Sequence, residues 1–153
     1  MKKVVNSATL NLWLYNIFMK FLGIDYGTKR IGLATADSQN KIATPLKVID
    51  NDGDALKEVV EVCKKKKIDT IVIGESKDRS GRENPVMEHA KEFANGLINS
   101  LETNIVFADE FGSSVAAKRQ PGSPMHVDGS AAAVILNRYL NQRDEKNDEN
   151  SNS

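Results

Sequence analysis

Cysteine and histidine are scarce in this chain, and neither sign of charge is in excess. Its 153 residues contain one cysteine, Cys63, and two histidines, His89 and His126. A disulfide framework and a zinc site with four Cys and His ligands are therefore excluded. The chain has 21 basic and 21 acidic residues, so its formal net charge is zero, which argues against a general polyanion binder. The lack of disulfides is typical of a reducing cytoplasm, where we expect the protein to act.

Long hydrophobic runs are absent as well, so we expect no membrane association. A transmembrane helix needs about 20 apolar residues, and Asn11 and Asn16 interrupt the apolar stretch near the start of the chain. We interpret residues 1–18 as an N-terminal extension, either an accessory helix or an upstream translation artefact, with Met19 as the physiological start. Residues 141–153 contain no apolar residue, which predicts a disordered polar tail.

The remaining residues, 19–140, have the composition and length of one globular domain. Short apolar or alternating segments predict strands at 21–26, 30–36, 44–49, 68–74 and 104–108. Amphipathic segments predict helices from Asp54 to Lys67, from Pro85 onward, after Ser113 and from Asp128. This order predicts an α/β fold with a mixed sheet, in which a three-strand antiparallel meander precedes parallel strands and helices cover both faces.

Acidic residues follow the ends of several predicted strands. They are Asp25, Glu75, Asp109 and Glu110, and Asp128 stands at the start of the last helix. Each one alone is equally explained as a loop residue, or in the case of Asp128 as a helix N-cap. If the strands are neighbours, however, these carboxylates meet at one sheet edge, where they repel one another unless a cation neutralises them. Carboxylates without Cys or His ligands favour Mg²⁺ or Mn²⁺, and such ions activate water for phosphodiester hydrolysis.

Basic residues near these acids are candidates for contact with nucleic-acid phosphates. Lys29 and Arg30 follow Gly27, a glycine that allows either a close backbone approach to phosphate or a positive φ in a hairpin turn. The other candidates are Lys77, Arg79, Arg82, Lys118 and Arg119. The four lysines at 64–67 end a predicted helix; we interpret them mainly as a solvated face that the helix dipole favours.

Several segments carry a family resemblance: FLGIDYGTKRIGLATAD at 21–37, ATPL at 43–46, IVIG at 71–74, NP at 84–85, ADE at 108–110 and VDGSAAAVIL at 127–136. On these segments the chain resembles the YqgF family, also called RuvX, whose members are named pre-16S rRNA nucleases and are similar to Holliday junction resolvases. The resemblance covers residues 19–140 and implies an RNase H-like fold. It also implies a metal-dependent hydrolase that acts on nucleic acid, in processing of the pre-16S rRNA 5′ end during ribosome biogenesis.

The resemblance further implies that Asp25, Glu110 and Asp128 hold the metal. Glu75 stands where the family often has Gly-Leu-Pro, and an acid near this strand end is reminiscent of true resolvases, so Glu75 is either an additional catalytic ligand or a peripheral loop acid. Strand alternation sends Asp109 and Glu110 to opposite faces, so only one of them should reach the metal.

Two other functions stay open. Phe111 stands where the family has arginine, which together with the zero net charge is compatible with a non-catalytic nucleic-acid-binding or ribosome-assembly factor. A Holliday junction resolvase is the other alternative. We expect nucleic acid as the partner, RNA in preference to DNA and within a ribosomal precursor, with the protein acting as a monomer or homodimer.

Overall fold

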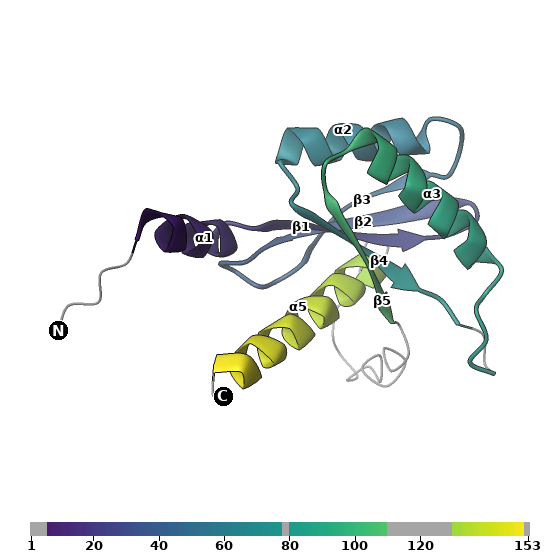
Figure 1. Ribbon diagram of the computed structural model, residues 1–153. Helices are drawn as coiled ribbons and strands as arrows, with labels where there is room; N and C mark the ends of the chain where they lie inside the picture. The colour runs from purple at the N-terminus through teal and green to yellow at the C-terminus, as the bar shows by residue number, and fades with distance from the viewer. Residues whose placement is uncertain (1–5, 78–79, 110–129, 152–153) are drawn as a thin grey trace, which may run out of the picture.

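The computed structural model describes residues 6–77, 80–109 and 130–151, and its centre is a five-stranded sheet (Figure 1). The strands are β1 (Lys20–Tyr26), β2 (Arg30–Asp37), β3 (Thr44–Asp50), β4 (Thr70–Glu75) and β5 (Asn104–Asp109), in the spatial order β3-β2-β1-β4-β5. β1, β2 and β3 pair antiparallel, whereas β4 pairs parallel with both β1 and β5. The predicted meander followed by parallel strands is thereby confirmed.

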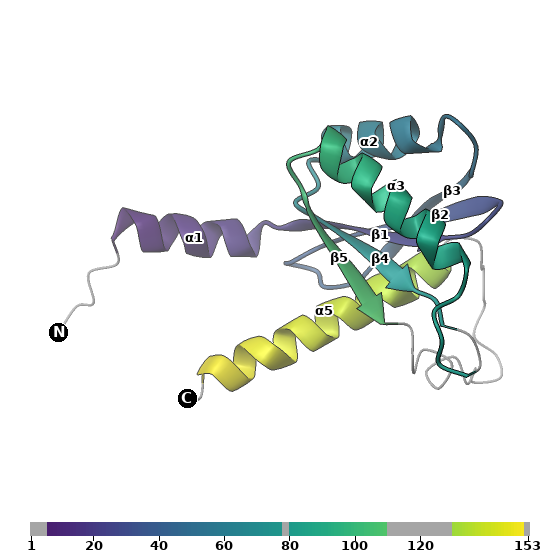
Figure 2. The same ribbon diagram turned by 45° about the vertical axis from the view of Figure 1, so that its right-hand side comes forward.

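Helices cover both faces of this sheet. α2 (Ala55–Lys66) and α3 (Val86–Ser100) lie over one face, and α5 (Ser130–Ser151) crosses the other (Figures 1 and 2). Because side chains alternate along a strand, β1 sends Leu22 and Ile24 into the core under α2 and α3. The same strand sends Phe21 into the core under α5. The sheet is therefore apolar on both sides, as expected for a mixed sheet between two helical layers.

A glycine allows α5 to pack closely on β1. A Cβ atom on Gly23 would lie 2.7 Å from the carbonyl oxygen of Ala132 and 2.9 Å from the Cβ of Leu136. Neither distance is tolerable, so any side chain at position 23 would push the helix away from the strand. This contact fixes the first turns of α5 over the carboxyl-terminal half of β1.

The accessory helix that was one interpretation of residues 1–18 is present as α1 (Ser7–Ile17). Asn6 caps it by accepting a hydrogen bond of 2.7 Å from the backbone N–H of Thr9. In both views α1 projects away from the sheet (Figures 1 and 2), and Leu12, Trp13 and Phe18 are largely exposed. Within the described residues, no helix combines the length and apolar character that a bilayer span requires.

The prediction of a disordered tail from residue 141 needs correction, since α5 continues to Ser151. A helix that is already formed extends at little cost per residue, and the Gln, Arg, Glu and Lys of this segment have good helix propensity. Two contacts also attach its first turn: the Arg143 guanidinium lies over the Phe21 ring at 5.3 Å, and Lys41 Nζ lies 2.9 Å from Asp144 Oδ2. Residues 145–150 are exposed, so this part is solvated but helical.

Candidate active site

Asp25 lies near the carboxyl end of β1, on the face that α5 covers. It pairs across the hairpin with Gly32 of β2. A Cβ atom on Gly32 would lie 3.6 Å from the Asp25 Cβ and 3.8 Å from the Ala132 Cβ. The small residues Gly32 and Ala132 therefore bring the aspartate next to the first turn of α5, where the positive end of the helix dipole favours a carboxylate.

No side chain in the described ranges compensates the charge of Asp25. The residue is half-buried, and desolvation raises the pKa of its carboxyl group above the usual value. Among the described residues, none donates a hydrogen bond to this carboxylate or forms an ion pair with it. A half-buried carboxylate in such a position is stabilised by a bound cation, which fits the oxygen chemistry that Mg²⁺ and Mn²⁺ prefer.

The turn after Asp25 is held by backbone contacts. The Gly27 N–H donates to the Arg30 carbonyl oxygen at 2.9 Å, and a Cβ on Gly27 would lie 2.6 Å from that same oxygen. Gly27 does not have a positive φ; among the described glycines only Gly81 does. The glycine is thus required for a close backbone approach, and the structure shows that approach toward Arg30.

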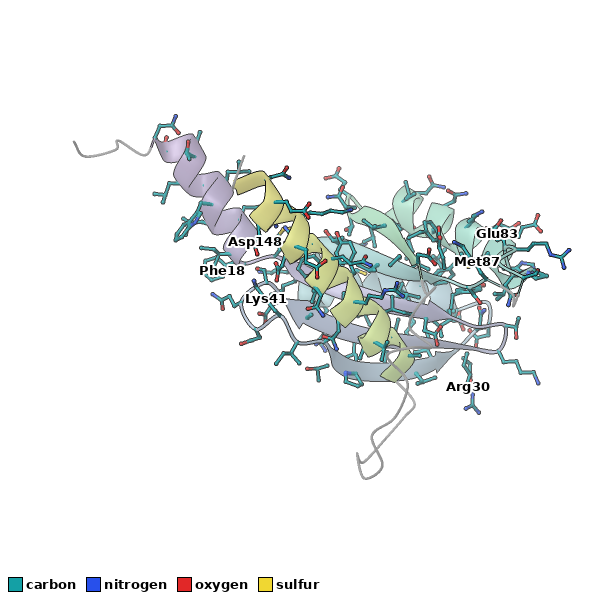
Figure 3. All side chains as sticks on the ribbon, turned by 90° about the horizontal axis from the view of Figure 1, so that it is seen from below. Phe18, Arg30, Lys41, Glu83, Met87 and Asp148 are labelled. Atoms are coloured by element: carbon teal, nitrogen blue, oxygen red, sulfur yellow. The ribbon has the colours of Figure 1, made fainter. Side chains whose placement is uncertain are left out.

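Asn51, which follows β3, fastens this turn and was not singled out from the sequence. Its Nδ2 donates to the Gly27 carbonyl oxygen at 2.8 Å, and its backbone N–H donates to the Lys29 carbonyl oxygen at 2.9 Å. The only sequence signal was an asparagine two residues after a predicted strand, which is too common to indicate a role. The turn presents Lys29 and Arg30 to solvent, and Figure 3 shows the Arg30 side chain extending away from the sheet.

Glu75 lies at the end of β4, but the structure does not bring it together with Asp25. It continues the series Ile71 and Ile73, which packs under α2 and α3, and its charge acts on Lys91 of α3. The position at the end of β4 that faces α5, as Asp25 does, is occupied by Gly74. The geometry therefore favours the second interpretation of Glu75, a peripheral acid.

Asp109 shares the face of Glu75, because the two residues pair in register across β4 and β5. Lys77 Nζ lies 3.2 Å from Asp109 Oδ2 and joins the loop after β4 to the end of β5. Arg82 donates from Nε to Ser80 Oγ at 2.9 Å. Lys77 and Arg82 are exposed, as expected of residues that contact a phosphate chain.

Part of the predicted site lies outside the described residues. This applies to the predicted ligands Glu110 and Asp128, to the predicted phosphate contacts Arg79, Lys118 and Arg119, and to Phe111. Over the part of the chain that the structure does describe, no group of three or more His, Cys, Asp or Glu side chains lies close enough to hold a metal ion. Asp25 is the predicted metal ligand whose surroundings the structure shows.

Comparison with known proteins agrees with this fold. A family model described as RuvX, Holliday junction resolvase, matches residues 19–142. A protein of Sulfurihydrogenibium named "Putative pre-16S rRNA nuclease" is 35% identical over 131 residues, which cover 80% of this chain and 90% of the relative. A second protein with this name, from Maridesulfovibrio salexigens, is 33% identical over 132 residues, covering 80% of this chain and 98% of the relative.

Among solved structures, RuvC of Thermus thermophilus has the same fold. It superimposes with a TM-score of 0.58 at 15% identity, over 82% of this chain and 96% of RuvC. At this identity the likeness establishes the fold, which is RNase H-like, as the sequence resemblance implied. Since the family model spans the whole sheet, α2, α3 and the first half of α5, the chain belongs to the RuvX family of Holliday junction resolvase-like nucleases.

Proposed function

We propose that this protein is a metal-dependent nuclease that hydrolyses phosphodiester bonds of the 16S rRNA precursor. Its relatives carry the name pre-16S rRNA nuclease, and family membership supports the same reaction class here. The observation that carries the proposal is Asp25, a half-buried carboxylate beside the first turn of α5 whose pKa is raised by desolvation. A nuclease needs a pre-positioned anion of this kind to hold a divalent cation.

The metal would be held by Asp25, Glu110 and Asp128. The sequence supports this set, because Glu110 comes two residues after Ala108, which packs against the core under α5, and Asp128 comes two residues before Ser130, where α5 begins. Glu75 is left out of the set because it shares the face of α3. Bound Mg²⁺ or Mn²⁺ would supply an activated water and stabilise the leaving oxygen at this position.

The residues of the chain itself would bind and orient the substrate. Lys29 and Arg30 are exposed on the turn directly after Asp25. They follow the aspartate by only a few residues, so they can contact a phosphate group that lies beside it. Gly27 and Asn51 fix the backbone of this turn, so the two cations are presented from a rigid support. Contacts to phosphates carry no base information; we therefore expect the shape of the strand to matter more than its sequence.

A Holliday junction is the second candidate substrate, because the matching family model is described as a Holliday junction resolvase. The two substrates are distinguished by offering each separately. One is an RNA that contains the 5′ flank of 16S rRNA, and the other is a four-way DNA junction.

The test is a cleavage assay with Mg²⁺, with Mn²⁺ and with a chelator, on the purified protein and two variants. Asp25→Asn removes the proposed ligand, and Asp148→Asn is the matched control on the exposed end of α5. We expect cleavage of the RNA only with a metal, its loss in Asp25→Asn, and unchanged cleavage in Asp148→Asn. Metal-independent RNA binding without cleavage by the unmodified protein would instead indicate a non-catalytic assembly factor.

A further inference from the structure

A groove opens at the end of the sheet opposite to Asp25, beyond the C-terminal end of α2. It has a volume of about 630 Å³, and its walls include Lys20, Thr35, Asp37, Ile42, Lys65 and Lys66. Lys20 begins β1, Asp37 is its cross-strand partner at the end of β2, and the other two lysines belong to the last turn of α2. Three separate segments of the chain therefore form this basic groove.

Among the described residues, Lys65 and Lys66 of the basic groove differ from four other lysines in having no ion-pair partner. Lys41, Lys47, Lys77 and Lys91 are each paired with a carboxylate. In the described part of the chain, no carboxylate lies within ion-pair distance of Lys65 or Lys66, and both side chains are exposed. Two further lysines, Lys64 and Lys67, adjoin them in the sequence. The overall charge of zero thus conceals a local excess of positive charge.

The single acid of the basic groove, Asp37, is not paired with Lys65 or Lys66: hydrogen bonds from Asn40 and Gln39, together with the charge of Lys20, lower the pKa of its carboxyl group. Asp37 accepts hydrogen bonds from the backbone N–H groups of Gln39 and Asn40, at 3.0 and 2.8 Å. Its other oxygen accepts from Asn40 Nδ2 at 3.1 Å, so the carboxylate holds the turn after β2 in shape. The carbonyl end of the α2 dipole amounts to roughly half a negative charge, which is also less than the charge of the lysines.

We propose that the basic groove binds phosphate groups of a nucleic-acid segment that lies away from the cleavage site. This inference rests on the proposed nuclease function and extends it to a second contact with the same substrate. Consecutive unpaired ammonium groups repel one another, and a phosphate chain relieves that repulsion while it releases its own counterions. A trough whose lysines come from both β1 and α2 suits an extended polyanion better than a single small ion.

The position of the groove determines which substrates it reaches. Lys20 and Asp25 are five residues apart in one strand, a distance of about 17 Å at roughly 3.3 Å per residue. They also lie on opposite faces, because Lys20 continues the series Leu22 and Ile24 while Asp25 faces α5. One short strand cannot touch both places. The groove therefore contributes to the binding of long or folded RNA and not to the binding of a few nucleotides.

The experiment measures RNA affinity by fluorescence anisotropy in the presence of a chelator, so that it is independent of cleavage. A folded RNA of several tens of nucleotides and a hexanucleotide are each titrated over a series of salt concentrations. The test variant is Lys65→Ala/Lys66→Ala. The charge-matched control is Lys57→Ala/Lys146→Ala, which removes two exposed lysines that do not line the groove. Thermal melts confirm that both proteins are folded.

We expect the test variant to bind the folded RNA roughly tenfold more weakly at low salt, with a salt slope lower by about 2. Its hexanucleotide affinity should equal that of the unmodified protein. The proposal is overturned if the folded RNA binds the test variant as tightly as the unmodified protein. It is also overturned if the control variant loses as much RNA affinity as the test variant, or if neither RNA binds the unmodified protein. The nuclease proposal is tested separately by the cleavage assay. Asp25→Asn should lose cleavage but keep its affinity for the folded RNA.

Discussion

Asp25 and Gly32 face each other across the β1–β2 hairpin, and the missing side chain of Gly32 leaves space directly beside the aspartate. A methyl group there would lie 3.6 Å from the Asp25 Cβ, which is an ordinary contact distance. The fold therefore tolerates alanine at this position, whereas the carboxylate loses the free volume next to it. Stability and activity are expected to respond to this substitution in opposite directions.

Gly32→Ala should leave the free energy of unfolding unchanged or raise it by up to about 1 kcal/mol, because glycine inside a strand is costly in conformational entropy. Metal-dependent cleavage should fall by roughly tenfold or more, because small displacements of a reacting group are expensive. Denaturant unfolding checks the stability, and kcat/KM measured on the same preparation checks the activity. A variant that unfolds more easily and keeps full activity would contradict the prediction.

Asp25→Asn is expected to stabilise the metal-free protein at neutral pH. The folded-state pKa of Asp25 is raised above the unfolded value of 3.8, so ionisation of this carboxyl group begins to disfavour folding as the pH rises above 3.8, and the effect is complete above the folded-state pKa. Below pH 3.8 the aspartate is protonated in both the folded and the unfolded state. The part of the stability difference from Asp25→Asn that comes from ionisation therefore disappears. Thermal melts between pH 3 and pH 8 in a chelator should show a gain in melting temperature that grows with pH. A constant difference across this range would show that ionisation of Asp25 is not its cause.

Divalent metal should stabilise the unmodified protein and not Asp25→Asn. A ligand that binds only the folded state adds about 2.7 kcal/mol at a free concentration of 100 times Kd. Titration with Mn²⁺ should therefore raise the melting temperature of the unmodified protein in a concentration-dependent way. Asp148→Asn provides the control, since it removes the same charge from an exposed position. An equal shift in Asp25→Asn would place the metal elsewhere.

Gly23→Ala should destabilise the fold by about 1–3 kcal/mol, the usual range for an overpacked core position. Its Cβ would lie 2.7 Å from the Ala132 carbonyl oxygen, a backbone atom that moves only with α5. Gly53→Ala is the matched control, because no atom lies within 4 Å of the position that its Cβ would take. Urea unfolding of both variants measures the difference. Equal stability would mean that α5 adjusts to the extra methyl group without cost.

The strand order and the two helical layers were predictable because local patterns determine them. Leu22, Ile24 and their neighbours form a buried run that ends at Asp25, and the later strands alternate with amphipathic helices. The sequence also placed Asp25 correctly near the carboxyl end of the first strand. What it could not decide was the face on which Glu75 lies, because a one-residue difference in where a strand starts reverses every side chain. Only the register of β4 against β1 shows that Gly74 takes the α5-facing position.

Long-range contacts account for the remaining differences. Asn51 reaches back 24 residues to Gly27, and Arg143 reaches back to Phe21 to support the start of the predicted tail. Neither contact has a local sequence signature. The polar composition of the last segment correctly predicted exposure at residues 145–150, but exposure does not prevent a helix from continuing when its first turns are packed against a sheet.

Deletion of residues 1–18 is expected to leave the fold intact, which tests the boundary placed at Met19. A hydrogen bond from Ser38 Oγ to the Ile17 carbonyl oxygen ties the end of α1 to the domain, whereas Leu12, Trp13 and Phe18 are largely exposed and bury little surface. The shortened protein should unfold within about 1 kcal/mol of the full chain, since little apolar area is lost from the core. It should also aggregate less, because exposed apolar side chains favour association. Urea unfolding and light scattering measure the two effects. A large loss of stability would show instead that α1 belongs to the folded domain.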